Sequence, residues 1–117
     1  MHGRAEKNQI WVNGAQLVPE QQETGVQRKV LAYCDAAMCV ENRFLAGQTG
    51  PLHSHPHTQI TYVAEGEFRF TIGTETRVVK KGDALLKQNG VEHGCVCLQD
   101  GVLIDIFVPM RQDFVEN

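Results

Sequence analysis

The chain of 117 residues is long enough for one domain with a single hydrophobic core and too short for two ordinary domains. Its formal net charge is -3, which argues against a nucleic-acid partner, because such a partner requires a basic face. Hydrophobic residues make up 42% of the sequence, a share that excludes a disordered chain.

Nothing in the sequence predicts secretion or membrane insertion. The first residues, MHGRAEKNQIW, contain no apolar segment and no small-residue cleavage site. The longest apolar run, VLIDIFV, is far shorter than a membrane span and is interrupted by Asp105. The cysteine spacings, C-x4-C and C-x-C, fit neither a redox pair nor a zinc ribbon, and we interpret these cysteines as reduced packing residues. We therefore expect a cytoplasmic protein without a membrane partner.

Hydrophobic residues alternate with period two almost throughout the chain, which is typical of strands. Residues 1–25 are interpreted as an N-terminal edge strand and loop, and residues 26–117 as one barrel. Strands are predicted over residues 26–34, 36–44, 59–66, 67–72, 76–83, 93–98 and 102–109. Glycine-containing segments such as AEGE, IGTE, KKGD and QDG are predicted turns between them, and residues 110–117 a terminal turn. Many short strands with glycine turns indicate an all-β barrel or sandwich.

Histidines are concentrated in the stretch GPLHSHPHTQITYV, at His53, His55 and His57. If this stretch is one strand, His53, His55 and Gln59 project to the same face. His93 follows a predicted glycine turn in GDALLKQNGVEHG. A lone histidine usually makes one hydrogen bond in the core or at the surface, but imidazoles from two separate segments indicate a metal site. Zn, Fe, Ni, Cu and Mn all accept imidazole ligands, so the metal stays open.

His57 offers an alternative to Gln59 as a ligand, because the two residues have the same parity. Pro56 bends the chain between His55 and His57, so we favour Gln59 as the ligand and place His57 beside the metal ligands. A neutral amide leaves the metal's positive charge without a carboxylate to offset it. Such a site attracts an anionic substrate.

Asp105 lies in the middle of the apolar segment GVLIDIFVPMR. Alternation predicts two faces for this strand: Leu103, Asp105 and Phe107 on one, and Val102, Ile104, Ile106 and Val108 on the other. A carboxylate there costs several kcal/mol unless it is paired or solvated. Three explanations stay open: an exposed edge strand, a structural pair with an arginine, or a wet cavity in which Asp105 transfers protons. Arg111 is a candidate clamp for an anion, because guanidinium matches a carboxylate with two hydrogen bonds.

Two segments resemble the conserved motifs of the cupin family. In the first, His53 and His55 form the H-x-H, Gln59 stands where glutamate is usual, and Gly66 closes the motif. In GDALLKQNGVEHGCVC the counterparts of the second motif are Gly82, Gly90 and His93, with Gln88 and Cys97 replacing the usual proline and asparagine. The resemblance implies a single-domain cupin jelly roll, a double-stranded β-helix barrel.

From Gly25 to Phe114 the sequence is similar to the pectin-degradation cupins of the KdgF type. That family holds a divalent transition metal with H-x-H, a glutamine and a later histidine, which implies His53, His55, Gln59 and His93 here. Its aspartate, phenylalanine and arginine near the C-terminus imply catalytic roles for Asp105, Phe107 and Arg111. Members convert 4,5-unsaturated monouronates, the products of pectin or alginate lyases, into linear keto forms.

The resemblance implies a small anionic sugar acid as substrate, and it leaves pectin-derived and alginate-derived uronates open. Alternatives are a small Fe(II) dioxygenase, a lyase or epimerase on another sugar acid, and a cupin that binds sugar acids without catalysis. We also expect a homodimer, because small cupins commonly pair and the face carrying Val102, Ile104, Ile106 and Val108 needs cover.

Overall fold

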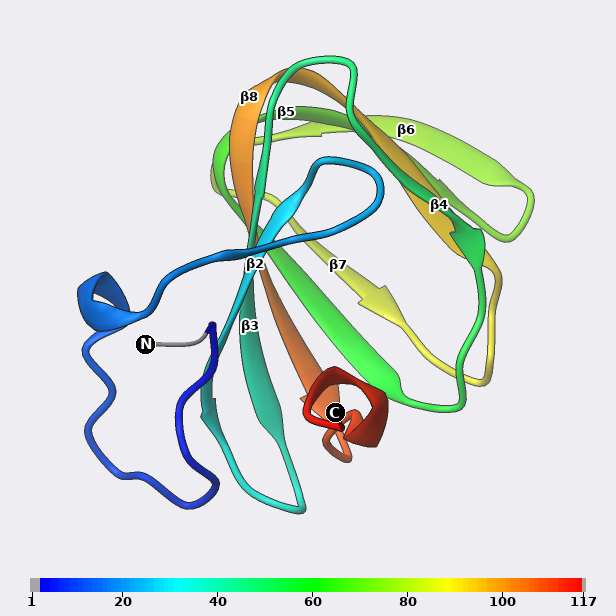
Figure 1. Cartoon of the computed structure of the whole chain (residues 1–117). Coiled ribbons are helices and arrows are strands. Elements are labelled where there is room, and N and C mark those ends of the chain that lie inside the picture. The colour runs from blue at the N-terminus through cyan, green and yellow to red at the C-terminus, as the bar shows by residue number, and fades with distance from the viewer. Residues whose placement is uncertain (1–2, 117) are drawn as a thin grey trace.

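The computed structural model describes residues 3–116, and strands dominate them (Figure 1). These residues form β1 (Glu20–Gln21), β2 (Gln27–Tyr33), β3 (Met38–Phe44), β4 (Thr49–His53), β5 (Thr58–Ile72), β6 (Glu75–Lys80), β7 (Ala84–Lys87) and β8 (His93–Val108). Two short 3-10 helices, η1 (Gly14–Gln16) and η2 (Gln112–Phe114), complete the described elements, and η2 forms the predicted terminal turn. No helix within residues 3–116 is long and apolar enough to cross a membrane.

Two long antiparallel strands, β5 and β8, run through both halves of the barrel and pair with each other along most of their length. The first part of β5 and the last part of β8 form one layer with β7, β3, β2 and β1. The last part of β5 and the first part of β8 form the other layer with β6 and β4. Figure 1 shows the two layers closing around a common interior. The predicted all-β jelly roll is confirmed.

The segments AEGE and QDG are not turns, which corrects the sequence-based prediction. Each lies inside a continuous strand, at a point where the pairing of β5 with β8 shifts register. Gly66 has φ +82°, and a Cβ there would lie 2.5 Å from the carbonyl oxygen of Asp100. A Cβ on Gly101 would lie 2.5 Å from the carbonyl oxygen of Glu65. These glycines allow the two strands to bend and approach closely where they pass from one layer to the other.

Inward-facing side chains form two apolar clusters. The larger cluster comprises Val26, Phe44, Val63, Phe68, Phe70, Val79, Cys95, Cys97 and Leu103. The smaller one comprises Val30, Met38, Val40 and Phe107. The buried polar or charged residues that the structure describes are Gln59, Thr61, Lys87, His93 and Asp105. Since uncompensated burial of such groups is costly, they mark the candidate functional part of the interior.

The predicted faces of β8 are correct over most of the strand. Leu103 and Phe107 are buried, and Val108 is exposed. Val102 is an exception: it is buried instead of facing outward, because the register between β5 and β8 shifts beside it.

The N-terminal segment lies along the outer edge of the sheet at β2. The amide of Ala5 donates to the carbonyl oxygen of Val30, and the amide of Val30 donates to that of Gly3. Glu20 and Gln21 pair with the start of the same strand. An edge strand and loop therefore occur within residues 3–25, while the domain boundary at residue 25 stays a prediction.

Candidate metal centre

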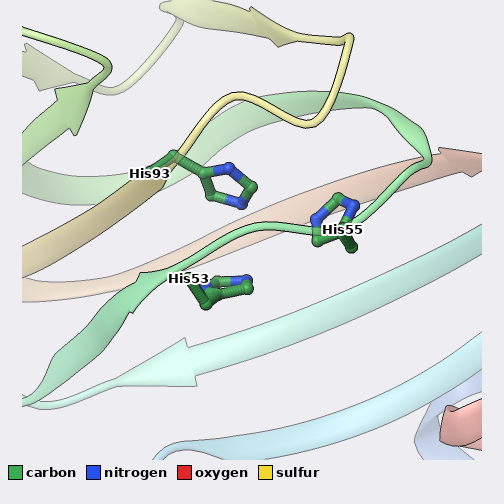
Figure 2. A group of neighbouring side chains, drawn as sticks. All are labelled: His53, His55 and His93. Carbon is green, nitrogen blue, oxygen red and sulfur yellow. The ribbon is translucent and has the colours of Figure 1, made fainter.

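Three histidines converge at one end of the barrel (Figure 2). His53 is the last residue of β4 and His93 the first of β8, and the two are directly opposite in the β4–β8 register. His55 follows in the connection to β5. The ring centroids are 4.5 Å apart for His53 and His93, 4.9 Å for His55 and His93, and 5.5 Å for His53 and His55. One potential ligand atom from each residue lies within 4.8 Å of the others, a spacing compatible with a shared metal ion.

The histidines meet for a different reason than the sequence suggested. The stretch from His53 to Gln59 is not one strand, because β4 ends at His53 and β5 begins at Thr58. Pro56 lies in the break between them. Cross-strand pairing brings His53 and His93 together, and the connection carries His55 back toward them. The parity argument therefore grouped His53 and His55 on the basis of the wrong local structure.

His53 and His93 each hold a ring nitrogen available for metal binding. His93 Nδ1 donates to the carbonyl oxygen of Val91 at 3.0 Å, and its Nε2 is buried without a partner. His53 Nδ1 donates to the carbonyl oxygen of Pro51 at 2.7 Å. Donation from Nδ1 leaves the lone pair on Nε2, the arrangement usual for metal-binding imidazoles. A buried nitrogen without a partner is rare, so His93 Nε2 fits a bound cation.

Burial keeps two of the rings neutral. It lowers the pKa of His93 to about 4, with the positive charge of Lys87 contributing. Burial also lowers the pKa of His55, and the charge of Arg111 acts in the same direction. A metal binds only the unprotonated imidazole, so protons compete weakly with a metal here at neutral pH.

Gln59 connects the histidines to the buried carboxylate. Its Oε1 accepts a hydrogen bond from His55 Nε2 at 2.9 Å, and its Nε2 donates to Asp105 Oδ1 at 2.8 Å. His55 Nδ1 is a buried atom without a partner. Gln59 is thus close enough to the histidine cluster to act as the fourth ligand of the sequence prediction, which stays a prediction.

Asp105 is 5% exposed and lines the central cavity, so an outward position on an edge strand is wrong. Besides the Gln59 amide, Thr61 Oγ1 donates to its Oδ1 at 2.5 Å and Asn42 Nδ2 donates to its Oδ2 at 2.7 Å. These donors are neutral, and within residues 3–116 Asp105 forms no ion pair with an arginine. Of the three explanations, the cavity position agrees with the structure.

Lys87 was missed by the sequence interpretation. It is 3% exposed, its Nζ donates to Thr61 Oγ1 at 2.7 Å, and the same atom lies 4.8 Å above the Phe70 ring. Burial lowers its pKa, and the charge of Asp105 opposes that effect. The four-residue strand β7 pairs Lys87 with Gln59, and nothing in the sequence indicated this pairing.

Thr61 and Asn42 were also missed. Thr61 lies two residues after Gln59 on β5, so its shared face was visible from the alternation alone. Asn42 lies on β3, and only the pairing of β3 with β8 brings it beside Asp105.

The cavity has a volume of about 270 Å³, close to the lower end of the sizes found for small-molecule sites. Its lining includes His53, Gln59, Asp105, Phe107 and Arg111. The Phe107 ring lies 5.7 Å from that of His55 and 6.2 Å from that of His57. His57 Nδ1 is buried without a partner, but this residue is outside the cluster of three.

Comparison with known proteins identifies the fold and the family. Residues 41–107 match the model of the cupin domain. The pectin degradation protein KdgF of Dickeya dadantii is 43% identical over 93 residues, which cover 78% of this chain and 84% of that protein. The chain is a cupin of the KdgF family.

Solved structures agree with this assignment. KdgF from Halomonas sp. superposes with a TM-score of 0.88 at 33% identity, covering 92% of this cupin and all of that chain. An RmlC-like cupin from Shewanella frigidimarina gives a TM-score of 0.90 at 35% identity, covering 95% of this cupin and all of that chain.

Proposed function

We propose that this cupin opens the ring of 4,5-unsaturated monouronates to give the linear keto acids. The observation that carries the proposal is the direct link, through Gln59, between a three-histidine cluster and the buried carboxylate of Asp105, which lines the cavity beside His53. Similarity to a protein named for pectin degradation supports this class of sugar acid.

His53, His55 and His93 are the residues that would hold a divalent transition metal, with Gln59 as a fourth ligand. The neutral rings of His55 and His93 and their unpartnered nitrogens fit Ni, Zn, Fe, Mn or Cu. When bound, the metal supplies a Lewis acid that stabilises negative charge on oxygen.

Asp105 is placed to move the proton that the reaction requires. Its carboxylate accepts the proton of the C1 hydroxyl as the bond between C1 and the ring oxygen breaks and a C1 aldehyde forms. The electron pair passes through the ring oxygen as an enolate, and Asp105 returns the proton to C4, so the product is an isomer and no oxidant is consumed. The three donors around Asp105 hold it in position for both transfers. Phe107 packs against the sugar ring and excludes water, and Arg111 binds the uronate carboxylate.

The test is the Asp105→Asn variant, with loss of the 4,5 double bond followed by ultraviolet absorbance. We expect turnover to fall by about 10²- to 10⁴-fold, because a positioned acid–base group contributes roughly that factor. Asp35→Asn is the matched control, since Asp35 is exposed and pairs with Lys7 at the surface. Wild-type turnover by Asp105→Asn contradicts the acid–base role. Oxygen consumption during turnover favours the dioxygenase, and ligand binding without turnover favours the non-catalytic cupin.

We also propose that the protein forms a homodimer through the outer face of β7, β5 and β8. Exposed apolar side chains on these strands are those of Ile60, Tyr62, Leu86 and Val108. Ile60 pairs directly with Leu86 on one side and with Ile106 on the other, so the apolar surface is continuous across the strands. A continuous apolar face on a small domain is typical of a protein–protein interface.

A further inference from the structure

The mouth of the cavity carries two arginines on one aromatic ring. The guanidinium carbon of Arg28 lies 3.8 Å from the centroid of Phe114, and that of Arg111 lies 4.2 Å from the same centroid. All three residues line the cavity that contains Asp105. Arg28 belongs to β2, whereas Arg111 and Phe114 belong to the segment after β8. Guanidinium groups pack favourably on aromatic faces, so Phe114 fixes both cations close together.

Strand register places Arg28 on the inner face of the sheet. Arg28 is directly opposite Asn42 in the pairing of β2 with β3. Directly opposed residues of an antiparallel pair project to the same face. Asn42 projects inward, because its amide donates to Asp105, and therefore Arg28 projects inward as well.

The two arginines differ in their partners. Arg111 donates through Nε and Nη2 to the two carboxylate oxygens of Asp113, at 3.2 and 2.7 Å. Arg28 has no ion pair and no side-chain hydrogen bond with any residue from 3 to 116. Burial lowers the pKa of Arg28, and the neighbouring charge of Arg111 acts in the same direction. Glu20 and Asp113 act in the opposite direction, but neither forms an ion pair with Arg28.

We propose that Arg28 and Arg111 together form the binding site for the carboxylate of the sugar acid, and that Asp113 occupies Arg111 until this carboxylate displaces it. This inference rests on the proposed function and adds Arg28 and Asp113 to its binding site. The Asp113 side chain is 59% exposed, and ion pairs with an exposed partner are weak. A ligand carboxylate that reaches both guanidinium groups therefore displaces Asp113 at little cost in free energy.

The test compares D-galacturonate with D-galactose, which lacks the carboxylate, in titration calorimetry of the full chain. We expect Arg28→Gln to weaken galacturonate binding by about 10-fold or more, since a hydrogen bond to a charged group is lost. Binding of galactose stays unchanged. Arg28→Lys, which keeps the charge without the planar fork, gives an intermediate loss and guards against a folding defect. Arg77→Gln is the matched control, because Arg77 is exposed on β6 and pairs with Glu75.

Asp113→Asn tests the competing carboxylate separately. We expect galacturonate to bind several-fold more tightly to this variant than to the wild-type protein. Weaker binding means that Asp113 orients Arg111, and it overturns the displacement step. The two-arginine site is overturned if Arg28→Gln binds galacturonate as tightly as the wild-type protein does. It is also overturned if the wild-type protein shows no measurable binding of galacturonate.

Kinetics on the unsaturated substrate separate this inference from the proposed function. We expect Arg28→Gln to raise KM by about the factor that its affinity for galacturonate loses, with a smaller effect on kcat. If Arg28→Gln converts the substrate with an unchanged KM, the role of Arg28 is wrong, and the proposed reaction is unaffected. A different outcome is that the wild-type protein does not convert the substrate, while carboxylate-dependent binding is still lost in Arg28→Gln. That outcome overturns the proposed reaction and supports the two-arginine site.

Discussion

Replacing Thr61 with valine, which has nearly the same shape, removes the hydroxyl that joins Lys87 to Asp105. This hydroxyl donates to Asp105 Oδ1 at 2.5 Å and accepts from Lys87 Nζ at 2.7 Å. A hydrogen bond to a charged group contributes about 1.5–3 kcal/mol, and more is lost when its partner stays buried. Asp105 keeps the amides of Gln59 and Asn42 as donors, so the free energy lost at Asp105 lies at the lower end of this range.

The larger loss of free energy occurs at Lys87, because its ammonium group makes no other hydrogen bond to the residues that the structure describes. We therefore expect Thr61→Val to lower the free energy of unfolding by about 3–4 kcal/mol, with each bond taken from the range for charged partners. Domains of this size are commonly stable by about 5–15 kcal/mol, so the variant still folds. We also expect kcat to fall, since Asp105 is less firmly positioned.

Urea denaturation of the metal-free protein measures the change, with Thr71→Val as the control. Thr71 lies on the same strand, but its hydroxyl pairs with that of Thr76 at the surface, at 2.9 Å. We expect the control to change stability by less than about 0.5 kcal/mol. If the two variants are equally stable, the hydroxyl of Thr61 does not support a buried charged network and the reasoning is refuted.

His53→Ala removes a proposed metal ligand and should abolish metal retention. The expected loss of metal affinity exceeds the roughly 10- to 100-fold that is typical of a residue that only supports a ligand. His57→Ala should retain the metal, and elemental analysis of both variants decides whether His57 is a ligand. In the metal-free protein, the pKa of His93 is lowered to about 4, so the unfolded chain binds more protons and stability rises with pH between about 4 and 6.5. The urea midpoint should therefore increase by the equivalent of about 1–3 kcal/mol across this range, and His93→Gln should flatten the curve. Finally, Ile60→Glu should convert a dimer into a monomer in light scattering without loss of fold; a monomeric wild-type protein would contradict the proposed interface.

Local alternation predicted the inner face of the site because side chains on a strand alternate regardless of what the strand pairs with. Leu103, Asp105 and Phe107 all face inward as expected. Alternation did not predict the length of β5 and β8, since Gly66 and Gly101 are typical of turns and here permit a bend inside a strand.

The residues that sequence reasoning missed depend on pairing between distant strands. Asn42 and Lys87 reach Asp105 and Thr61 only through the β3–β8 and β5–β7 registers. A polar residue in a short segment such as ALLK gives no sign of being buried. The sequence interpretation named Arg111 as an anion clamp but missed its ion pair with Asp113, which only the structure shows.

The bend at Gly66 and Gly101 has a consequence for any attempt to change what this protein binds. β8 carries His93 at its first residue and Asp105 beyond the bend, so the angle at Gly101 determines how far the two side chains lie from each other. Neither glycine touches the cavity. Directed evolution of new specificity can vary the mouth, but a side chain at either glycine would displace one half of the candidate site relative to the other.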